Sequence, residues 1–180
     1  MSQPARRFAE WTESLSSDVW TVWSLMTNDK IAQQGRRLLA GSLNYILTHL
    51  DLIPDHERAG AIDDGFVLRL ACALASEHAA EASVSDSAKL GRLANDEDEI
   101  KAAFDEAVFA KLRRYVVGLA DKEVRGRTTE RILSDEKARN DFKKELEAAL
   151  KRIKPVTVAD DKDAEALLLT VKSYLTIKLK

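Results

Sequence analysis

Apolar residues recur at steps of three and four along most of this chain, a period that predicts amphipathic helices. In the first stretch, about residues 4–26, the apolar stripe comprises Phe8, Trp11, Leu15, Val19, Val22 and Met26. Similar stripes predict further helices over about 29–48, 64–82, 96–119, 134–153 and 164–179. Residues 83–96 are expected to form a polar linker or a short helix. The pattern therefore predicts an all-α protein, a compact bundle of about six helices.

The stretch 64–82 differs from the others because its first three turns are apolar nearly all round the helix. A helix of this kind is usually central and covered by its neighbours. A short connector joins it to the helix over about 29–48. We therefore expect these two helices to form a helical hairpin at the centre of the bundle.

A polar segment near the C-terminus divides the chain. Residues 154–163 read KPVTVADDKD, and Pro155 ends the preceding helix, so this segment is predicted to be a linker. Residues 1–153 then form one helical domain, and residues 164–180 form a C-terminal amphipathic helix. We expect this helix to pack on its own domain, with exchange onto a partner in a homo-oligomer as the alternative.

Composition and the N-terminus indicate where the protein works. The chain is 45% hydrophobic and 32% charged, as in folded proteins rather than disordered ones. Its single cysteine, Cys72, permits no internal disulfide, which favours a reducing compartment. The N-terminus lacks the apolar run of a signal peptide, and no stretch approaches the roughly 20 apolar residues of a transmembrane helix. We therefore expect a cytoplasmic protein without a transmembrane segment.

The connector of the central hairpin is rich in aspartate. It reads LNYILTHLDLIPDHERAGAIDD over residues 43–64 and carries Asp51, Asp55, Asp63 and Asp64. As turn-forming residues, Asp63 or Asp64 would accept hydrogen bonds from the free amides at the start of the next helix. Asp51 would close a turn over the two residues that follow it, and Pro54 would fix the backbone there. This interpretation explains the aspartates without a ligand and is preferred.

A divalent cation is the alternative reason for so many carboxylates. Hard cations such as Ca²⁺ and Mg²⁺ take oxygen ligands, which Asp51, Asp55, Asp63 and Asp64 would supply. His49 and His56 would add imidazole and favour a transition metal. The spacing does not match an EF-hand loop. A metal-dependent enzyme or a cation-binding protein is therefore the first alternative, and a divalent cation is the one candidate cofactor.

The connector reads YILTHLDLIPD and then GAIDDGFVL: a tyrosine-bearing helix, a D-L-I-P-D turn, a glycine and a D-D pair. In these residues, about 38–75, the chain resembles the YkvA-like family, a bacterial domain family of unknown function. The resemblance implies a helical hairpin and no established activity. Between the two motifs this chain has a polar loop, His56-Glu57-Arg58-Ala59, one residue shorter than the apolar stretch that is usual in the family.

Two pairs of residues are candidate contacts for a protein partner. Trp20 and Trp23 lie beside the stripe of the first helix, so an aromatic edge would stay exposed there. Leu168 and Tyr174 lie on the C-terminal helix. Because exposed aromatic residues often anchor interfaces, we predict that these four residues contact another protein, whose identity the sequence does not give.

The best basic cluster comprises Lys111, Arg113, Arg114, Lys122, Arg125, Arg127 and Arg131. Acidic residues are interleaved with it and no base-reading motif accompanies it, which favours a salt-bridged surface over phosphate contacts. A nucleic-acid accessory protein is therefore the second alternative, and nucleic acid is not the expected partner.

Motifs of common enzyme classes do not occur in the sequence: it has no glycine-rich phosphate loop, nucleophile elbow or H-E-x-x-H pattern. No catalytic residue is predicted. The sequence thus predicts a non-enzymatic helical protein that serves as a protein-interaction or regulatory module.

Overall fold

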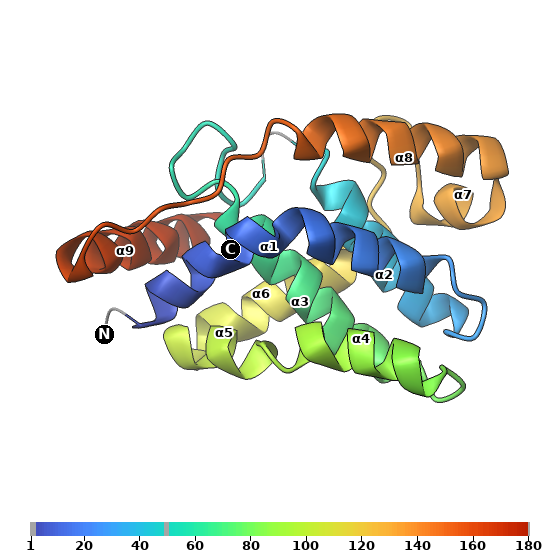
Figure 1. Ribbon diagram of the computed structural model, residues 1–180, viewed down its shortest axis with the longest axis horizontal. Helices are drawn as coiled ribbons and strands as arrows, with labels where there is room; N and C mark the ends of the chain where they lie inside the picture. The colour runs from blue at the N-terminus through green and yellow to red at the C-terminus, as the bar shows by residue number, and fades with distance from the viewer. Residues whose placement is uncertain (1–2, 49–50, 180) are drawn as a thin grey trace.

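Nine α-helices make up the part of the chain that the computed structural model describes, residues 3–48 and 51–179 (Figure 1). They are α1 (Gln3–Met26), α2 (Gln33–Tyr45), α3 (Ile62–Ser76), α4 (Val84–Ala94), α5 (Glu97–Ala103), α6 (Glu106–Leu119), α7 (Thr129–Ser134), α8 (Glu136–Leu150) and α9 (Asp161–Lys178). The predicted all-α class is confirmed. None of the described helices is long and apolar enough to cross a membrane.

Helix α3 runs through the middle of the molecule (Figure 1). Fourteen of its fifteen residues are buried, and it contacts α1, α2, α4, α5 and α6. A helix that is apolar nearly all round has no face suited to water, so neighbours cover every side. The helix ends at Ser76, earlier than the apolar pattern predicts, and the chain turns there towards α4.

Two clusters of buried apolar residues lie on the two sides of α3. One contains the aromatic group Phe8, Trp11, Phe66 and Phe104 and reaches α6 and α9. Within it the rings of Phe8 and Phe66 meet edge to face, with centroids 4.7 Å apart, a favoured arrangement. The other cluster joins the second half of α1 to α2, α4, α7 and α8. The apolar stripe of α1 belongs to both, so this helix fixes the two halves relative to each other.

The helix expected over 96–119 is instead two helices. Phe104 has extended backbone angles, φ −120° and ψ 159°, and packs against Phe66. Asp105 then caps α6 by accepting a hydrogen bond from the Val108 amide at 2.9 Å. Ser83 likewise caps α4, in the stretch expected to be a linker or short helix. Such breaks preserve the spacing of the apolar residues, so the periodic pattern underestimates the number of helices.

The segment between α8 and α9 runs along one edge of the molecule (Figure 1). The Val156 amide holds it down by donating to the hydroxyl of Thr12 at 2.7 Å. Helix α9 packs on α1 and α6 of the same chain, and its start is tied to Arg6 through Asp161 and to Arg58 through Asp163. We call residues 151–157 of this segment the strap, because it connects the half of the molecule that contains α8 to the half that contains α9.

A buried ion cluster joins α1, α3 and α4. Arg69 of α3 is only 2% exposed, and it donates to Asp18 at 3.1 Å and to Asp96 at 2.7 Å. Its guanidinium lies over the ring of Trp11, 4.2 Å from the centroid. Arg92 also donates to Asp18, at 2.8 Å. Within this cluster, the buried charges of Arg69 and Asp18 thus each have an opposite charge beside them, as burial requires.

Candidate functional site

Hydrogen bonds of Tyr45 and Asp63 organise the aspartate-rich connector. The hydroxyl of Tyr45, at the end of α2, donates to the carboxylate of Asp63, in the first turn of α3. The same carboxylate accepts from the Ile53 amide at 3.1 Å, and the Tyr45 hydroxyl accepts from the Leu52 amide at 2.9 Å. Asp63 therefore links both helices of the hairpin to the connector.

This geometry corrects the predicted helix capping. The N-cap of α3 is Ala61, and no side chain caps it. Asp63 and Asp64 lie inside the first turn, where a negative charge still favours the helix end. The amides of Leu52 and Ile53 go to Tyr45 and Asp63, so Asp51 does not close the predicted turn over them.

Three of the four predicted aspartates are buried: Asp51, Asp63 and Asp64. Asp55 is exposed. Among the described residues, no group of three or more His, Cys, Asp or Glu side chains is arranged to hold a metal ion. His49 lies outside the described residues. The cation site therefore stays a prediction.

Burial sets the ionisation of the two aspartates in α3. Desolvation raises the pKa of Asp63 to about 7, although the hydrogen bonds from Tyr45 and Ile53 favour the ionised form. The pKa of Asp64 is raised well above its usual value by desolvation and then by the charges of Asp63, Asp51 and Asp55. These carboxylates therefore repel one another in a dry environment.

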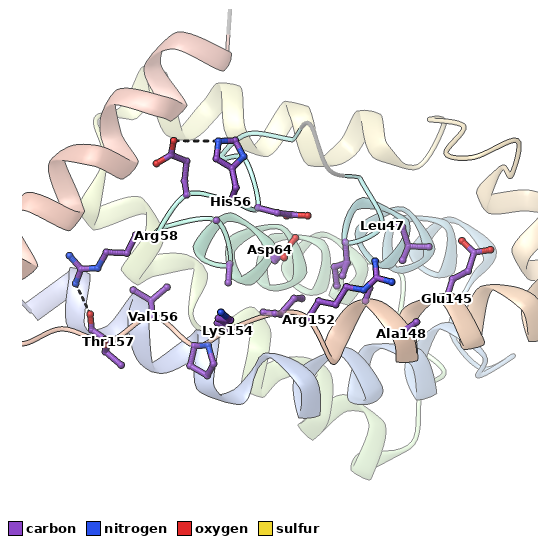
Figure 2. Close-up of a pocket in the computed structure, with 18 of the residues that line it drawn as sticks. Leu47, His56, Arg58, Asp64, Glu145, Ala148, Arg152, Lys154, Val156 and Thr157 are labelled. Atoms are coloured by element: carbon purple, nitrogen blue, oxygen red, sulfur yellow. Dashed lines mark hydrogen bonds and ion pairs between the residues drawn. The ribbon is translucent and has the colours of Figure 1, made fainter.

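A cavity of about 560 Å³ lies beside the connector, between the start of α3, helix α8 and the strap 151–157 (Figure 2). Asp55 and Asp64 line it, whereas Asp51 and Asp63 do not. Asp64 is 2% exposed, and its Oδ1 atom makes no hydrogen bond with any described residue. Asp64 therefore contributes a buried carboxyl group to the wall of the cavity, and one oxygen of that group has no partner among the described residues.

Two of the four Arg and Lys side chains that line the cavity are engaged in ion pairs. Arg125 donates to Glu145 at 3.2 Å, and Arg58 donates to Asp163 of α9 and to the carbonyl of Thr157. Figure 2 shows the contact of Arg58 with Thr157 at one end of the cavity and Glu145 at the other.

Arg152 and Lys154, both on the strap, are different. Both line the cavity with exposed side chains. Neither pairs with a carboxylate in residues 3–48 or 51–179. Figure 2 shows them on the side of Asp64 opposite the loop that carries His56. The strap therefore adds to the cavity two basic side chains without a carboxylate partner among the described residues, across from the carboxyl group of Asp64.

The four residues predicted to contact a protein lie against the core. Trp20 and Trp23 are half-buried and meet edge to face, with ring centroids 6.1 Å apart. Leu168 and Tyr174 are half-buried against the apolar cluster shared by α6 and α9. On α9 the exposed large apolar residues are Leu169 and Ile177. The contact surface of these four residues stays a prediction.

The predicted basic cluster is divided among several ion pairs. Arg113 pairs with Glu77 and Glu97, and Arg131 lies 3.8 Å from Asp135. Arg125 and Arg127 both pair with Glu145. The arginines are therefore spread over several elements and largely neutralised, rather than forming one face for phosphate groups.

Sequence reasoning missed the two strap cations. Arg152 and Lys154 flank Ile153 just before Pro155, and nothing local marks them as part of a site. They come close to the connector only because Val156 and α9 fix the path of the strap. Comparison of the chain with protein-family models, with curated proteins and with solved structures found no match.

Proposed function

We propose that this chain is a binding protein, a regulatory module that takes up a small molecule in the cavity beside Asp64. One observation carries the proposal: the buried carboxyl group of Asp64 lines the cavity, and its Oδ1 atom has no hydrogen-bond partner in the described part of the chain. A buried polar group without a partner costs free energy. A ligand that supplies the missing hydrogen bond would recover that free energy.

The size and lining of the cavity support this role. Its volume of about 560 Å³ is within the range of small-molecule sites, about 300–1,000 Å³. Apolar walls from Leu47, Ala149 and Ile153 surround a small number of polar groups, which is typical of such sites. The strap closes one side of the cavity and connects α8 to α9, so a ligand that contacts the strap would affect both helices.

The other expectations have less support than the cavity. A protein contact through α9 stays a proposal, and Leu169 and Ile177, which are 65% and 64% exposed, would be its apolar part. The YkvA-like resemblance and the cytoplasmic location also stay proposals. Cys72 is buried in α3, and burial raises the pKa of its thiol to about 12, which suits a structural residue.

A thermal-shift screen tests the binding role. Neutral, anionic, cationic and zwitterionic small molecules are tested against the wild type and against Ala148→Trp, which fills the cavity from an exposed position on α8. The matched control is Ala110→Trp, at an exposed position on α6 outside the cavity. A true ligand at 100 times its Kd stabilises the protein by about 2.7 kcal/mol. We expect this stabilisation in the wild type and the control, and none in Ala148→Trp.

Two results would overturn the proposed function. In one, no compound of any charge class stabilises the wild type. In the other, every compound that does so stabilises Ala148→Trp to the same extent, which would place its site elsewhere.

A further inference from the structure

We propose that the ligand of this cavity is a small zwitterion, with its ammonium group against Asp64 and its carboxylate against Arg152 and Lys154. This inference rests on the proposed function and gives the chemical class of the ligand. It follows from the distribution of charge over the two facing walls.

The connector wall is acidic. Asp55 and Asp64 line the cavity, and Asp51 and Asp63 are close enough for their charges to act on Asp64. A carboxyl group among other carboxylates and out of water is best satisfied by a hydrogen-bond donor that carries positive charge. An ammonium group meets both requirements and brings three N–H donors.

The strap wall is basic. Arg152 and Lys154 line the cavity without a carboxylate partner among the described residues, whereas Arg58 and Arg125 are held by Asp163 and Glu145. An arginine fork and a lysine ammonium together suit a carboxylate, which accepts two parallel N–H bonds from arginine.

The two walls together select against simpler ions. A plain anion would bring no donor to the carboxyl group of Asp64, whose Oδ1 atom has no partner among the described residues, and a plain cation would leave Arg152 and Lys154 without a partner. A zwitterion satisfies both walls in one molecule. The apolar side chains of Leu47 and Ile153, which also line the cavity, would contact its carbon chain.

Calorimetric titration of the full chain in the presence of EDTA tests the inference. The first probes are the α-amino acids and the ω-amino acids from β-alanine to 6-aminohexanoate, which vary the separation between the two charges. The best binder is then compared with its N-acetyl derivative, which lacks the ammonium, and its amide, which lacks the carboxylate. We expect each derivative to bind at least about tenfold more weakly, because each loses one charge-assisted contact.

Variants assign each end of the ligand to its wall. Asp64→Asn should weaken binding of the zwitterion and of its amide, but leave the N-acetyl derivative unchanged. Arg152→Gln combined with Lys154→Gln should weaken the zwitterion and the N-acetyl derivative, but leave the amide unchanged. The matched control is Lys151→Gln, an exposed neighbour outside the cavity lining, which should bind like the wild type.

The inference is wrong if no amino acid in either series binds, or if a derivative that lacks one charge binds as tightly as its parent. It is also wrong if the variants weaken all three compounds equally. In these cases a neutral, anionic or cationic compound that Ala148→Trp excludes would still support the proposed function. Failure of every charge class in the screen would overturn both.

Discussion

The hydroxyl of Tyr45 donates a hydrogen bond to the carboxylate of Asp63, and this contact joins the end of α2 to the first turn of α3. Both groups are buried, and both also accept an amide of the connector, from Leu52 and Ile53 respectively. The bend of the hairpin is thus closed by one side chain from each helix. Asp64, the next residue, contributes nothing to this closure and faces the cavity instead.

Replacing Tyr45 with Phe should destabilise the protein by roughly 2–4 kcal/mol. The change keeps the ring but leaves the Leu52 amide without its acceptor and removes the donor from Asp63. Each buried group that loses its partner costs about 1–3 kcal/mol. Urea unfolding at pH 7 measures the difference. The control is Tyr115→Phe, because the half-buried ring of Tyr115 meets the ring of Tyr45 edge to face. This variant should lower the free energy of unfolding by less than about 1 kcal/mol. If both variants lowered it equally, the role of the Tyr45 hydroxyl would be contradicted.

The stability of the wild type should fall as the pH rises from 5 to 8, relative to Asp63→Asn. The folded protein holds the Asp63 proton up to a pKa of about 7, whereas the unfolded chain releases it near 3.8. Between these values the folded state binds more protons, so the free energy of unfolding decreases with pH.

The difference in unfolding free energy between the two proteins should change by about 1–3 kcal/mol between pH 5 and 8. Each pH unit over which only the folded state holds the proton contributes about 1.4 kcal/mol. Urea unfolding of both proteins at several pH values measures the change, and groups that titrate alike in both cancel. Asp163, whose pKa is lowered to about 2 by Arg58, titrates below this range. A difference that is flat with pH would show that Asp63 is ionised throughout.

Removing the charge of Arg69 should cost about 3–5 kcal/mol, because Arg69→Met leaves the buried Asp18 and the half-buried Asp96 with fewer positive partners. The matched control is Arg92→Gln. Arg92 also pairs with Asp18, but its side chain is 54% exposed, so we expect a loss of under about 1 kcal/mol. Thermal and urea unfolding measure both. If the two variants lost the same unfolding free energy, the contribution of Arg69 would come from the contact with Asp18 that it shares with Arg92, and not from its burial.

Sequence patterns locate the elements of this fold better than they describe the contacts between them. The sequence of α3 is apolar on nearly every side of the helix. It therefore predicts a central position, because no face of such a helix is suited to water. The pattern misses the break at Phe104, since an extended residue within a continuous apolar stripe leaves no periodic trace. It also gives no sign of the role of Arg69, because the partners Asp18 and Asp96 come from other parts of the chain.

The candidate site was predicted in part for the same reason. The aspartates are visible as a dense local motif, and the sequence identifies all four. Asp63 closes the hairpin, whereas Asp64 lines the cavity. This difference arises because consecutive side chains of α3 point in different directions around the helix axis. The strap that brings Arg152 and Lys154 into place depends on contacts between distant parts of the chain, which local patterns do not encode.

Helices α2 and α6 approach each other closely at Gly41. A Cβ atom added to this glycine would stand 2.7 Å from the carbonyl carbon and oxygen of Leu119, at the end of α6. The obstacle is backbone, which cannot rotate away. Gly41→Ala should therefore destabilise the protein by about 1–3 kcal/mol through displacement of α2 from α6.

The matched control is Gly118→Ala. A Cβ atom at Gly118 meets nothing within 4 Å, and the position lies inside α6. Alanine is favoured over glycine within a helix by about 0.5–1 kcal/mol, so this variant should be more stable than the wild type. Urea unfolding of the two variants gives opposite signs if α2 and α6 pack as described. If Gly41→Ala stabilised the protein, α2 would have to lie farther from α6. The position of Tyr45, at the end of α2, relative to α3 would then have to be revised.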